Sequence, residues 1–444
     1  ALIEGDAGKV ILWADDSTIF NGEIFARGGA LSGDGGFVEI SGKKYLDFNG
    51  SVDTNSINGR MGTLLLDPEN LVIKDGTNDG DGDGSDYNFY GFNSNTPGWI
   101  LANDPESTLY ESELEGMSAS THIILEATND ITMESLTRLD LQASSGSITI
   151  TADSDGSGGG DFFMDINDEI VTQGGNVTIS GANVTLGDIT TNGGNLTASA
   201  SDTSITVGGD IYSSNGDVLL QGNTVFTNTT TIDAGTGNIC FADACANSAN
   251  NYTVATDGAF WHFLTLIGHD IVFTGNIGGS GEEFDKITIT SSGDVKAGTY
   301  DMFAYGLLSS GASSFTLGSF TQSLGTNKSA HVEISSDVIS VGNIVTSANN
   351  EGGNITLNAA DITVGALNSS GGQKGGHISI TATDDTFNGV PSITLNGDIN
   401  ALDTGDANSN GTVSISLAGT DTPLGTFVLG YTGAFTSAVS VTGS

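Results

Sequence analysis

The sequence predicts an all-β protein, a parallel β-helix (solenoid) with short extra-helical excursions, one of which contains a short helix. Three observations lead to this fold class: short strands with period-2 alternation, a unit that recurs along the chain, and a composition rich in glycine and poor in proline. Glycine accounts for 65 of 444 residues and proline for only 5. Tight turns at regular intervals need residues that adopt φ > 0, which explains the glycine.

Apolar residues alternate with Thr, Ser or Asn in short runs that are bounded by Gly, Asn and Asp. This alternation, with many β-branched residues, is the strand signal. Helical periodicity is nearly absent. The clearest runs are Val177-Thr-Ile179, Val184-Thr-Leu186, Ile205-Thr-Val207, Ile287-Thr-Ile289, Ile355-Thr-Leu357, Ile378-Ser-Ile380 and Val413-Ser-Ile415.

The strands also repeat as a larger unit. Residues 174–194 align without gaps to residues 352–372, with nine identities in 21 positions. A unit of roughly 20 to 23 residues cannot bury its own apolar face, but such units can share one core when they stack in register. Because stacked strands lie ~4.8 Å apart, about 20 coils predict a rod on the order of 90 to 100 Å long.

Two segments interrupt the predicted stack. We assign residues 1–73 to β-helix coils, 74–120 to an acidic and aromatic excursion, 121–235 to coils, 236–263 to an excursion with both cysteines, and 264–444 to coils. The first excursion holds the one predicted helix, near residues 108–117. Thr108 and Glu111 are its predicted capping box, and Tyr110, Leu114 and Met117 form an apolar stripe.

Charge and composition exclude several classes of protein. There are 54 Asp+Glu and 11 Lys+Arg, a net charge of −43 at pH 7. Nucleic acids and anionic membranes are bound through clustered Lys and Arg, so neither is an expected partner. No run approaches the ~20 apolar residues that span a bilayer. Because the chain starts at Ala1 rather than Met, we expect a processed or excised segment.

The first 73 residues resemble the filamentous-haemagglutinin-like exoproteins of bacterial two-partner secretion, in the segment that follows their amino-terminal secretion domain. The motifs that carry the resemblance are GKVILWAD at 8–15, FNGEIFARGG at 20–29, GDGGFVEISGK at 33–43 and GTLLLDP at 62–68. The likeness continues to about residue 195 and is only that of a generic β-helix beyond. The Asn-Pro-Asn turns of the secretion domain are missing from this sequence.

The resemblance implies a right-handed β-helical rod that is exported through an outer-membrane β-barrel partner and is secreted or displayed at the bacterial cell surface. An adhesin of this kind attaches to a host cell, a glycan or a neighbouring cell. We therefore expect a non-enzymatic adhesin segment. Two alternatives stay open: a structural subunit of a homo-oligomeric extracellular filament or matrix, and a carrier stalk for a larger secreted toxin.

Asp79, Asp81 and Asp83, followed by Gly84, match the D-x-D-x-D-G start of a calcium loop, in which alternate carboxylates converge on a hard cation. Position 12 of that frame is Tyr90 rather than Glu, so Asp86 is the candidate closing ligand. The alternative is a solvated acidic turn. Asp406, Asn408 and Asn410 have similar spacing with a single carboxylate, and Asp153, Asp155 and Asp161 flank a Gly-rich loop; ordinary turns explain both groups.

Cys240 and Cys245 are close enough in sequence for one local disulfide, which is the expected state in an exported protein. No His or further Cys lies at a spacing suited to a metal site. Asn-x-Ser/Thr sequons, such as those at Asn176, Asn183, Asn195 and Asn354, fall within the strand repeat. We expect their side chains to form ladders at coil corners rather than to carry glycans.

Enzymatic motifs are absent from the sequence. There is no G-x-S-x-G, no G-x-x-x-x-G-K-[ST] and no H-E-x-x-H. Some β-helix proteins cleave acidic polysaccharides with paired carboxylates, but that substrate calls for neutralising cations, and the arginines are only Arg27, Arg60 and Arg138. The aromatic cluster of Tyr87, Phe89, Tyr90 and Trp99 could stack on sugars; packing within the excursion is the other interpretation.

Overall fold

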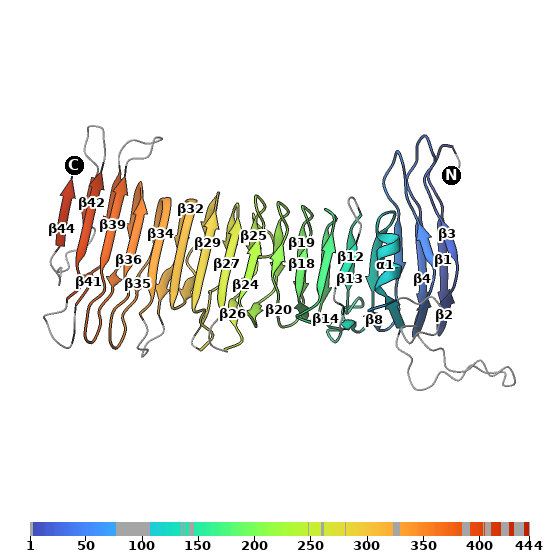
Figure 1. Ribbon diagram of the computed structural model, residues 1–444, viewed down its shortest axis with the longest axis horizontal. Helices are drawn as coiled ribbons and strands as arrows, with labels where there is room; N and C mark the ends of the chain where they lie inside the picture. Colours follow the sequence, from blue (N-terminus) through green and yellow to red (C-terminus); the bar gives the residue numbers. More distant parts are fainter. Residues whose placement is uncertain are drawn as a thin grey trace. The chain divides into compact units, whose positions relative to one another are not determined.

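The computed structural model describes residues 3–76, 107–134, 136, 138–141, 146–246, 248–258, 262–279, 281–322, 329–383, 391–402, 404, 410–418, 426–429 and 439–443. The chain forms two compact units, 1–216 and 217–444. Each unit is a parallel β-helix built almost entirely from short strands (Figure 1), which confirms the predicted fold class. In the described part of the chain, no helix is long and apolar enough to cross a membrane.

In the unit 1–216, the elements stack into three faces, and one coil contributes two paired strands to the second face. The first face stacks β1 (Lys9–Ala14), β4 (Phe37–Gly42), β7 (Thr63–Leu66), β10 (His122–Glu126), β13 (Ile148–Thr151), β16 (Val177–Gly181) and β19 (Leu196–Ala200). The second contains β2 (Ser17–Phe20), β5 (Tyr45–Phe48), β9 (Ser107–Tyr110), β8 (Leu71–Lys74), β11 (Ile131–Glu134), β14 (Phe162–Met164), β17 (Val184–Leu186) and β20 (Ile205–Val207). The third contains β3 (Glu23–Phe25), β6 (Ser51–Asp53), β12 (Leu139–Leu141), β15 (Glu169–Thr172), β18 (Asp188–Thr190) and β21 (Ile211–Tyr212).

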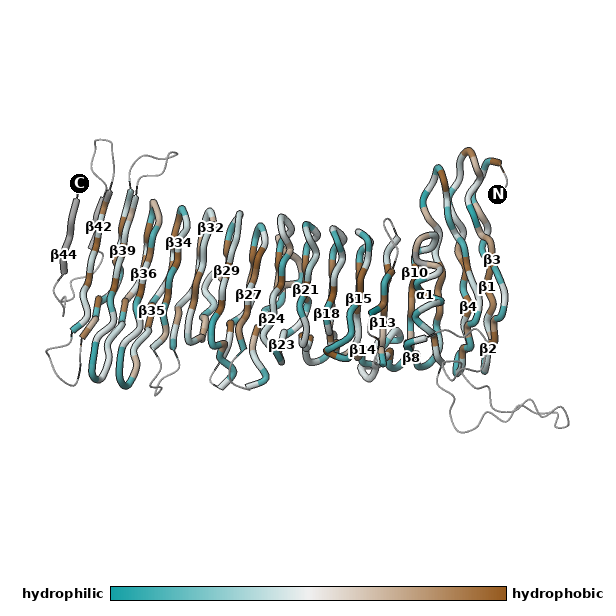
Figure 2. The backbone as a smooth tube through the Cα atoms, viewed as in Figure 1, coloured by the Kyte–Doolittle hydropathy of each residue, from teal (hydrophilic) through white to brown (hydrophobic). Residues whose placement is uncertain are grey.

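The parallel register places equivalent residues of successive coils side by side. Val38, Leu64 and Ile123 form one such row, and it continues through Ile148 and Val177. All five side chains are buried. On each strand, the residue that follows the row residue faces outward. Figure 2 shows that apolar residues recur along the strands of successive coils. The stacked apolar rows are the shared core that a single coil cannot build.

The helix of the first excursion replaces a strand. α1 (Glu111–Ser118) contacts β6 and β12 and occupies the third face between them. Its apolar stripe of Tyr110, Leu114 and Met117 is buried, as predicted. The predicted capping box is wrong, because residues 107–110 form β9 and pair with β8. The helix therefore begins three residues later, and the Glu113 carboxylate accepts a hydrogen bond of 2.9 Å from the Tyr110 N–H.

The unit 217–444 also has three faces. The first contains β22 (Val218–Gln221), β25 (Ile239–Phe241), β28 (Ile271–Phe273), β30 (Asp294–Lys296), the second halves of β32 (Gly306–Leu317) and β34 (His331–Val341), β37 (Asp361–Val364), β40 (Ser392–Leu395) and β43 (Thr426–Leu429). The second contains β23 (Thr224–Phe226), β26 (Val254–Thr256), β31 (Asp301–Phe303), β33 (Ser319–Thr321), β35 (Ile344–Val345), β38 (Leu367–Asn368) and β41 (Ile399–Asn400). The third contains β24 (Thr230–Asp233), β27 (Phe263–Gly268), β29 (Lys286–Ser291), the first halves of β32 and β34, β36 (Ile355–Ala359), β39 (Ile378–Thr383), β42 (Val413–Ala418) and β44 (Val439–Gly443).

Two coil strands lie within the range 236–263 that the sequence assigns to a second excursion. β25 and β26 pair with β22 and β23, so they belong to the regular stack. Runs of only three apolar or small residues are too short to separate from loop by periodicity. The irregular part of this range is the segment between these two strands, which contains Cys245.

Polar side chains at the corners connect successive coils, as the sequence predicts. The Asn176 side chain accepts a hydrogen bond of 2.9 Å from the Asn195 N–H, and Asn354 accepts one of 2.9 Å from the His377 N–H. The Asn183 amide donates to Asp161 at 2.9 Å. These sequon asparagines therefore satisfy backbone and side-chain groups of neighbouring coils.

Candidate functional site

Several residues that the sequence singles out lie outside the described part of the chain. Asp79, Asp81, Asp83 and Asp86 of the calcium motif are among them, as are Asp406, Asn408 and the aromatic residues Tyr87, Phe89, Tyr90 and Trp99. The calcium prediction therefore stays a prediction. Asp153, by contrast, is described and closes its own turn: its carboxylate accepts hydrogen bonds from the Ser157 hydroxyl and the Gly158 N–H at 3.2 and 2.9 Å.

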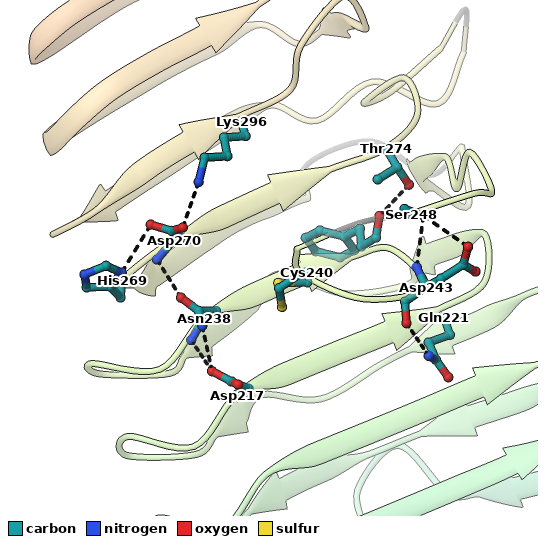
Figure 3. The surroundings of a disulfide bond; sticks show 12 residues. Asp217, Gln221, Asn238, Cys240, Asp243, Ser248, His269, Asp270, Thr274 and Lys296 are labelled. Atoms are coloured by element: carbon teal, nitrogen blue, oxygen red, sulfur yellow. Dashed lines mark hydrogen bonds and ion pairs between the residues drawn. A yellow bond between two sulfur atoms is a disulfide. The ribbon is translucent and has the colours of Figure 1, made fainter.

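Cys240 and Cys245 form a disulfide with a Cα–Cα distance of 5.3 Å (Figure 3). It joins the buried strand β25 to the start of the irregular segment that follows. Asp243 lies inside this small loop, and its carboxylate accepts hydrogen bonds from the Tyr252 hydroxyl at 2.6 Å and the Asn250 amide at 2.9 Å. These donors hold the pKa of Asp243 well below its ordinary value. Since every donor belongs to the same segment, the arrangement orders the loop.

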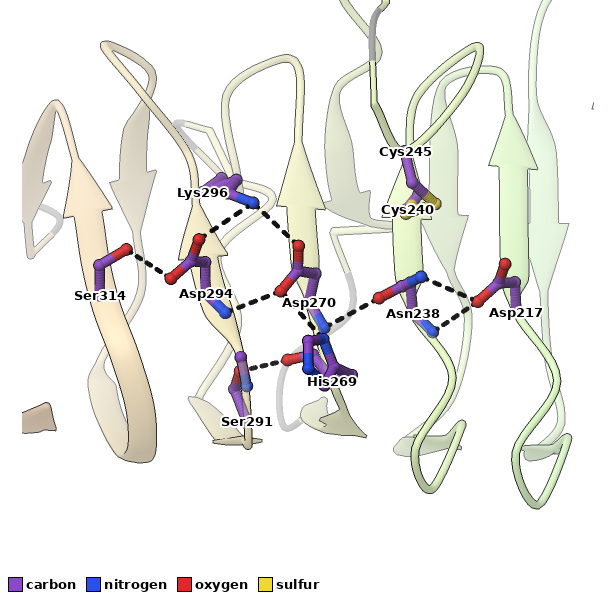
Figure 4. A network of polar contacts seen from close by, with 11 residues as sticks. Asp217, Asn238, Cys240, Cys245, His269, Asp270, Ser291, Asp294, Lys296 and Ser314 are labelled. Atoms are coloured by element: carbon purple, nitrogen blue, oxygen red, sulfur yellow. Dashed lines mark hydrogen bonds and ion pairs between the residues drawn. A yellow bond between two sulfur atoms is a disulfide. The ribbon is translucent and has the colours of Figure 1, made fainter.

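A ladder of polar side chains runs across the first face of the unit 217–444 (Figure 4). Asp217, Asn238, Asp270 and Asp294 stand just before a strand or at its first residue, and the side-chain oxygen of each accepts a hydrogen bond from the equivalent residue of the next coil. Asp217 accepts from the Asn238 N–H at 2.8 Å, Asn238 from the Asp270 N–H at 3.1 Å, and Asp270 from the Asp294 N–H at 2.9 Å. The Ser314 hydroxyl donates to Asp294 at 2.9 Å.

Lys296 neutralises two rungs of this ladder. Its Nζ lies 2.8 Å from Asp270 Oδ2 and 3.1 Å from Asp294 Oδ2, so one ammonium bridges carboxylates on adjacent coils. Although burial raises the pKa of Asp270, the hydrogen bond from Lys296 and the Asp294 N–H lower it overall. The hydrogen bond to Asp270 raises the pKa of Lys296 in turn. This carboxylate pair carries its own cation.

A second group of carboxylates lies on the outward side of the first face of the unit 1–216. Trp13 pairs with Ser41 across β1 and β4. Leu66 pairs with both Ile40 and Leu125, so Asp67, the next residue, lies between Ser41 and Glu126. We call Trp13, Ser41, Asp67 and Glu126 the Trp13–Glu126 row. Since Leu64 and Leu66 are fully buried, alternation along the strand directs Asp67 outward.

The carboxylates of the Trp13–Glu126 row have no cation beside them among the described side chains. In the part of the chain that the structure describes, neither Asp67 nor Glu126 makes an ion pair or a side-chain hydrogen bond. Burial raises the pKa of Asp67 to about 6, and the negative charges of Glu126 and of Glu39 on β4 add to that rise.

The row also contains an unsatisfied hydroxyl and an exposed indole. Ser41 is fully buried, and its Oγ has no hydrogen-bond partner. Its neighbour Trp13 is 54% exposed. An exposed aromatic ring, a buried hydroxyl without a partner and two unpaired carboxylates therefore share one outward row of a rigid sheet.

Three other carboxyl groups have raised pKa values, and in Asp47 burial alone raises the pKa. Burial, a hydrogen bond with Asp75 and the nearby charges raise the pKa of Glu111 to about 7. Burial also raises the pKa of Asp168 to about 6, against the lowering effect of a backbone hydrogen bond from Leu136. Glu111 is the first residue of α1, and Asp168 follows a turn just before β15.

Within the described ranges, no group of three or more His, Cys, Asp or Glu side chains is arranged to hold a metal ion. The three arginines are all engaged: Arg27 with Asp53, Arg60 with Asp34, and Arg138 with Asp140 and Glu169. No known family model matches the chain, and no curated protein matches it with significant sequence similarity.

Sequence reasoning missed both carboxylate groups. Asp270 and Asp294 are 24 residues apart, and Asp67 and Glu126 are separated by the whole first excursion, so neither pair forms a local motif. The available signal was the period-2 pattern, which places Glu126 two residues beyond Ile124 on the outward side of β10. Only the register between coils shows which outward residues are neighbours.

Proposed function

We propose that this chain is a non-enzymatic segment of a secreted or cell-surface protein that attaches to another surface. The observation that supports this best is the coil-to-coil ladder, in which outward side chains form hydrogen bonds with the next coil and so stiffen the sheet. A stiff solenoid presents binding groups at fixed intervals and multiplies weak contacts. Export through an outer-membrane β-barrel partner belongs to this proposal and rests on the family resemblance.

A second candidate is a structural subunit of an extracellular filament or matrix. It is favoured by apolar side chains on β1 and β3, where Ile11, Trp13 and Phe25 are 50%, 54% and 59% exposed. Exposed apolar side chains that lie close together on a surface favour association with another protein surface. The third candidate, a carrier stalk for a toxin, keeps the same β-helix and differs in what it carries.

Adhesion and electron microscopy separate these candidates. Beads coated with the purified chain should adhere to host or bacterial cells, while negative-stain images with and without calcium show isolated particles. Filaments in the images and no adhesion would favour the structural subunit. Neither adhesion nor filaments would leave the carrier stalk, and shortening of a polysaccharide by the chain would contradict the non-enzymatic proposal.

The calcium motif at Asp79, Asp81, Asp83 and Asp86 enters this proposal as a separate element. Calcium bound there would order an acidic segment of a chain whose net charge is −43. A calorimetric titration tests it directly. Saturable binding that is lost when Asp81 and Asp83 are changed to Asn supports the motif, and the absence of saturable binding at millimolar calcium leaves the acidic turn.

A further inference from the structure

Among the described residues, no cation bridges the carboxylates of the Trp13–Glu126 row, whereas Lys296 bridges Asp270 and Asp294. Asp67 and Glu126 lie on adjacent coils, as Asp270 and Asp294 do, at the strand spacing of ~4.8 Å. Lys296 bridges the second pair at 2.8 and 3.1 Å. No side chain of the described residues does the same for the first pair. The Lys296 bridge shows that one cationic group fits between two carboxylates on adjacent coils.

The aromatic rings on the same coils differ in whether a cation lies over them. Lys9 Nζ lies 4.6 Å from the centre of the Phe37 ring, and Arg27 lies 4.6 Å from the centre of the Phe25 ring. These rings have an internal cation above their faces, the arrangement that the aromatic quadrupole favours. Tryptophan is the aromatic residue type that attracts cations most strongly. Trp13 is half exposed, and no cation of the described side chains lies over its ring.

The buried Ser41 hydroxyl gives an independent indication of a ligand. Ser41 lies between Trp13 and Asp67 in the row and faces outward with them, because the neighbouring Ile40 is fully buried inside the coil. A buried hydroxyl with no partner is costly, and native structures normally satisfy such groups. Because Ser41 Oγ is fully covered, a ligand N–H between Trp13 and Asp67 would supply the missing donor only after the neighbouring side chains move apart.

We propose that the Trp13–Glu126 row binds arginine side chains of a cationic peptide segment of a partner protein. One guanidinium lies between Asp67 and Glu126, where its fork of donors matches two carboxylates. A second lies on the Trp13 indole within reach of Ser41 and Glu39. A metal ion fits less well, because no group of three ligating side chains converges among the described residues. A neutral sugar would leave both carboxylates without a counter-charge.

The proposal concerns binding in solution and does not depend on the chain being an attachment protein. Its test is calorimetric titration of the whole chain with the peptide Ac-Arg-Gly-Arg-NH2 at about 0.15 M salt, which screens long-range attraction. The neutral peptide Ac-Ser-Gly-Ser-NH2 is the control ligand. We expect saturable binding of the arginine peptide alone, accompanied by a change in tryptophan fluorescence that is absent from Trp13→Phe.

Matched variants separate the row from the general acidity of the chain. Asp67→Asn with Glu126→Gln should weaken binding about tenfold or more, because hydrogen bonds to charged groups are lost. Asp202→Asn with Asp337→Asn removes the same charge from exposed positions and should change binding less than twofold. Trp13→Ala should weaken binding about two- to fivefold. Leu65→Lys, which places an ammonium beside Asp67, should compete with the peptide in a chain that keeps both carboxylates.

Three results would overturn the proposal. The first is no saturable binding of the arginine peptide at millimolar concentration. The second is an equal loss of affinity in the two charge-matched double variants, which would assign binding to the overall field. The third is a pair of observations: N-acetylchitotriose binds and its binding is lost in Trp13→Ala, while removal of the two carboxylates leaves binding of the arginine peptide unchanged. That result would make the row a sugar-binding site. Circular dichroism of each variant confirms that it folds.

Discussion

Two carboxylate pairs in this β-helix are each formed by residues in register on adjacent coils, but a lysine bridges only one of them among the described residues. Asp270 and Asp294 lie on adjacent coils, and Lys296 joins them while the Asp294 N–H donates to Asp270. Asp67 and Glu126 also lie on adjacent coils, but no cation of the described residues reaches them, and the pKa of Asp67 is raised to about 6. The first pair is part of the stacking of the coils. In the second pair the negative charges of Asp67 and Glu126 repel each other, and a cationic partner would reduce that repulsion.

The difference shows how a repetitive scaffold can carry a site without a recognisable motif. Stacking brings any outward residue within ~4.8 Å of its equivalents on both sides. Whether a row stabilises the stack or remains available for binding then depends on a single side chain, such as the lysine at position 296. The four predictions below test this comparison, starting from the largest expected effect.

The largest effect on stability is expected from Gly293→Ala, a substitution beside the Asp270–Asp294 pair. A Cβ at this position would lie 2.3 Å from Asp270 Oδ1 and 2.6 Å from the His269 ring. Both side chains would have to move, which breaks the Asp270 contacts, and we expect a loss of about 2 kcal/mol in the free energy of unfolding. Chemical denaturation measures it. Gly159→Ala, which meets nothing within 4 Å, is the control and should change stability by much less.

Lys296→Met should destabilise the protein by about 1 kcal/mol at pH 7, because two partly exposed ion pairs are lost and two carboxylates are left together. The pKa of Asp270 is lowered in the folded state, so its contribution is present above the ordinary carboxyl pKa and is lost as pH falls through the folded value. The effect of the substitution should therefore disappear in strong acid. Equal destabilisation at pH 3 and pH 7 would mean that packing of the lysine stem is responsible.

Asp67→Asn should stabilise the free protein by about 1 kcal/mol at pH 7, a figure discounted from the shift of the pKa because the carboxyl is half exposed. A carboxyl whose folded pKa is raised destabilises the fold when ionised, so wild-type stability falls as pH rises from about 4 through about 6. The charged groups that face Asp67 from the neighbouring strands are Glu39 and Glu126. Denaturation curves at pH 4 and pH 7 measure the effect; destabilisation by the substitution at pH 7 would contradict the assignment.

Leu65→Lys should give the Asp67–Glu126 pair a cation of its own. Leu65 faces outward two residues before Asp67, and Lys296 stands two residues after Asp294. The new ammonium should stabilise the protein by about 0.5 kcal/mol and lower the pKa of Asp67. Carboxyl titration followed by NMR on a side-chain-labelled sample measures the pKa. An unchanged pKa would show that position 65 does not face Asp67 as the register implies.

Much of the fold could be predicted from local sequence. The alternation at Val177-Thr-Ile179 and at Ile355-Thr-Leu357 predicted β16 and β36, and the burial of Tyr110, Leu114 and Met117 followed from helical spacing. The start of α1 could not be predicted, because Ser107–Tyr110 has both a capping-box pattern and an apolar run. Pairing of that run with β8, a tertiary interaction, decided in favour of the strand.

The sequence by itself determined the class of fold, since period-2 alternation and glycine corners repeat along the chain and a unit of that size is stable only when stacked. It also placed the two cysteines within bonding reach and the sequon asparagines in the strand repeat. Only the tertiary structure decided which outward side chains are neighbours, because Trp13, Ser41, Asp67 and Glu126 meet through the register of four coils. That register depends on the packing of buried rows across long loops, which no local spacing encodes.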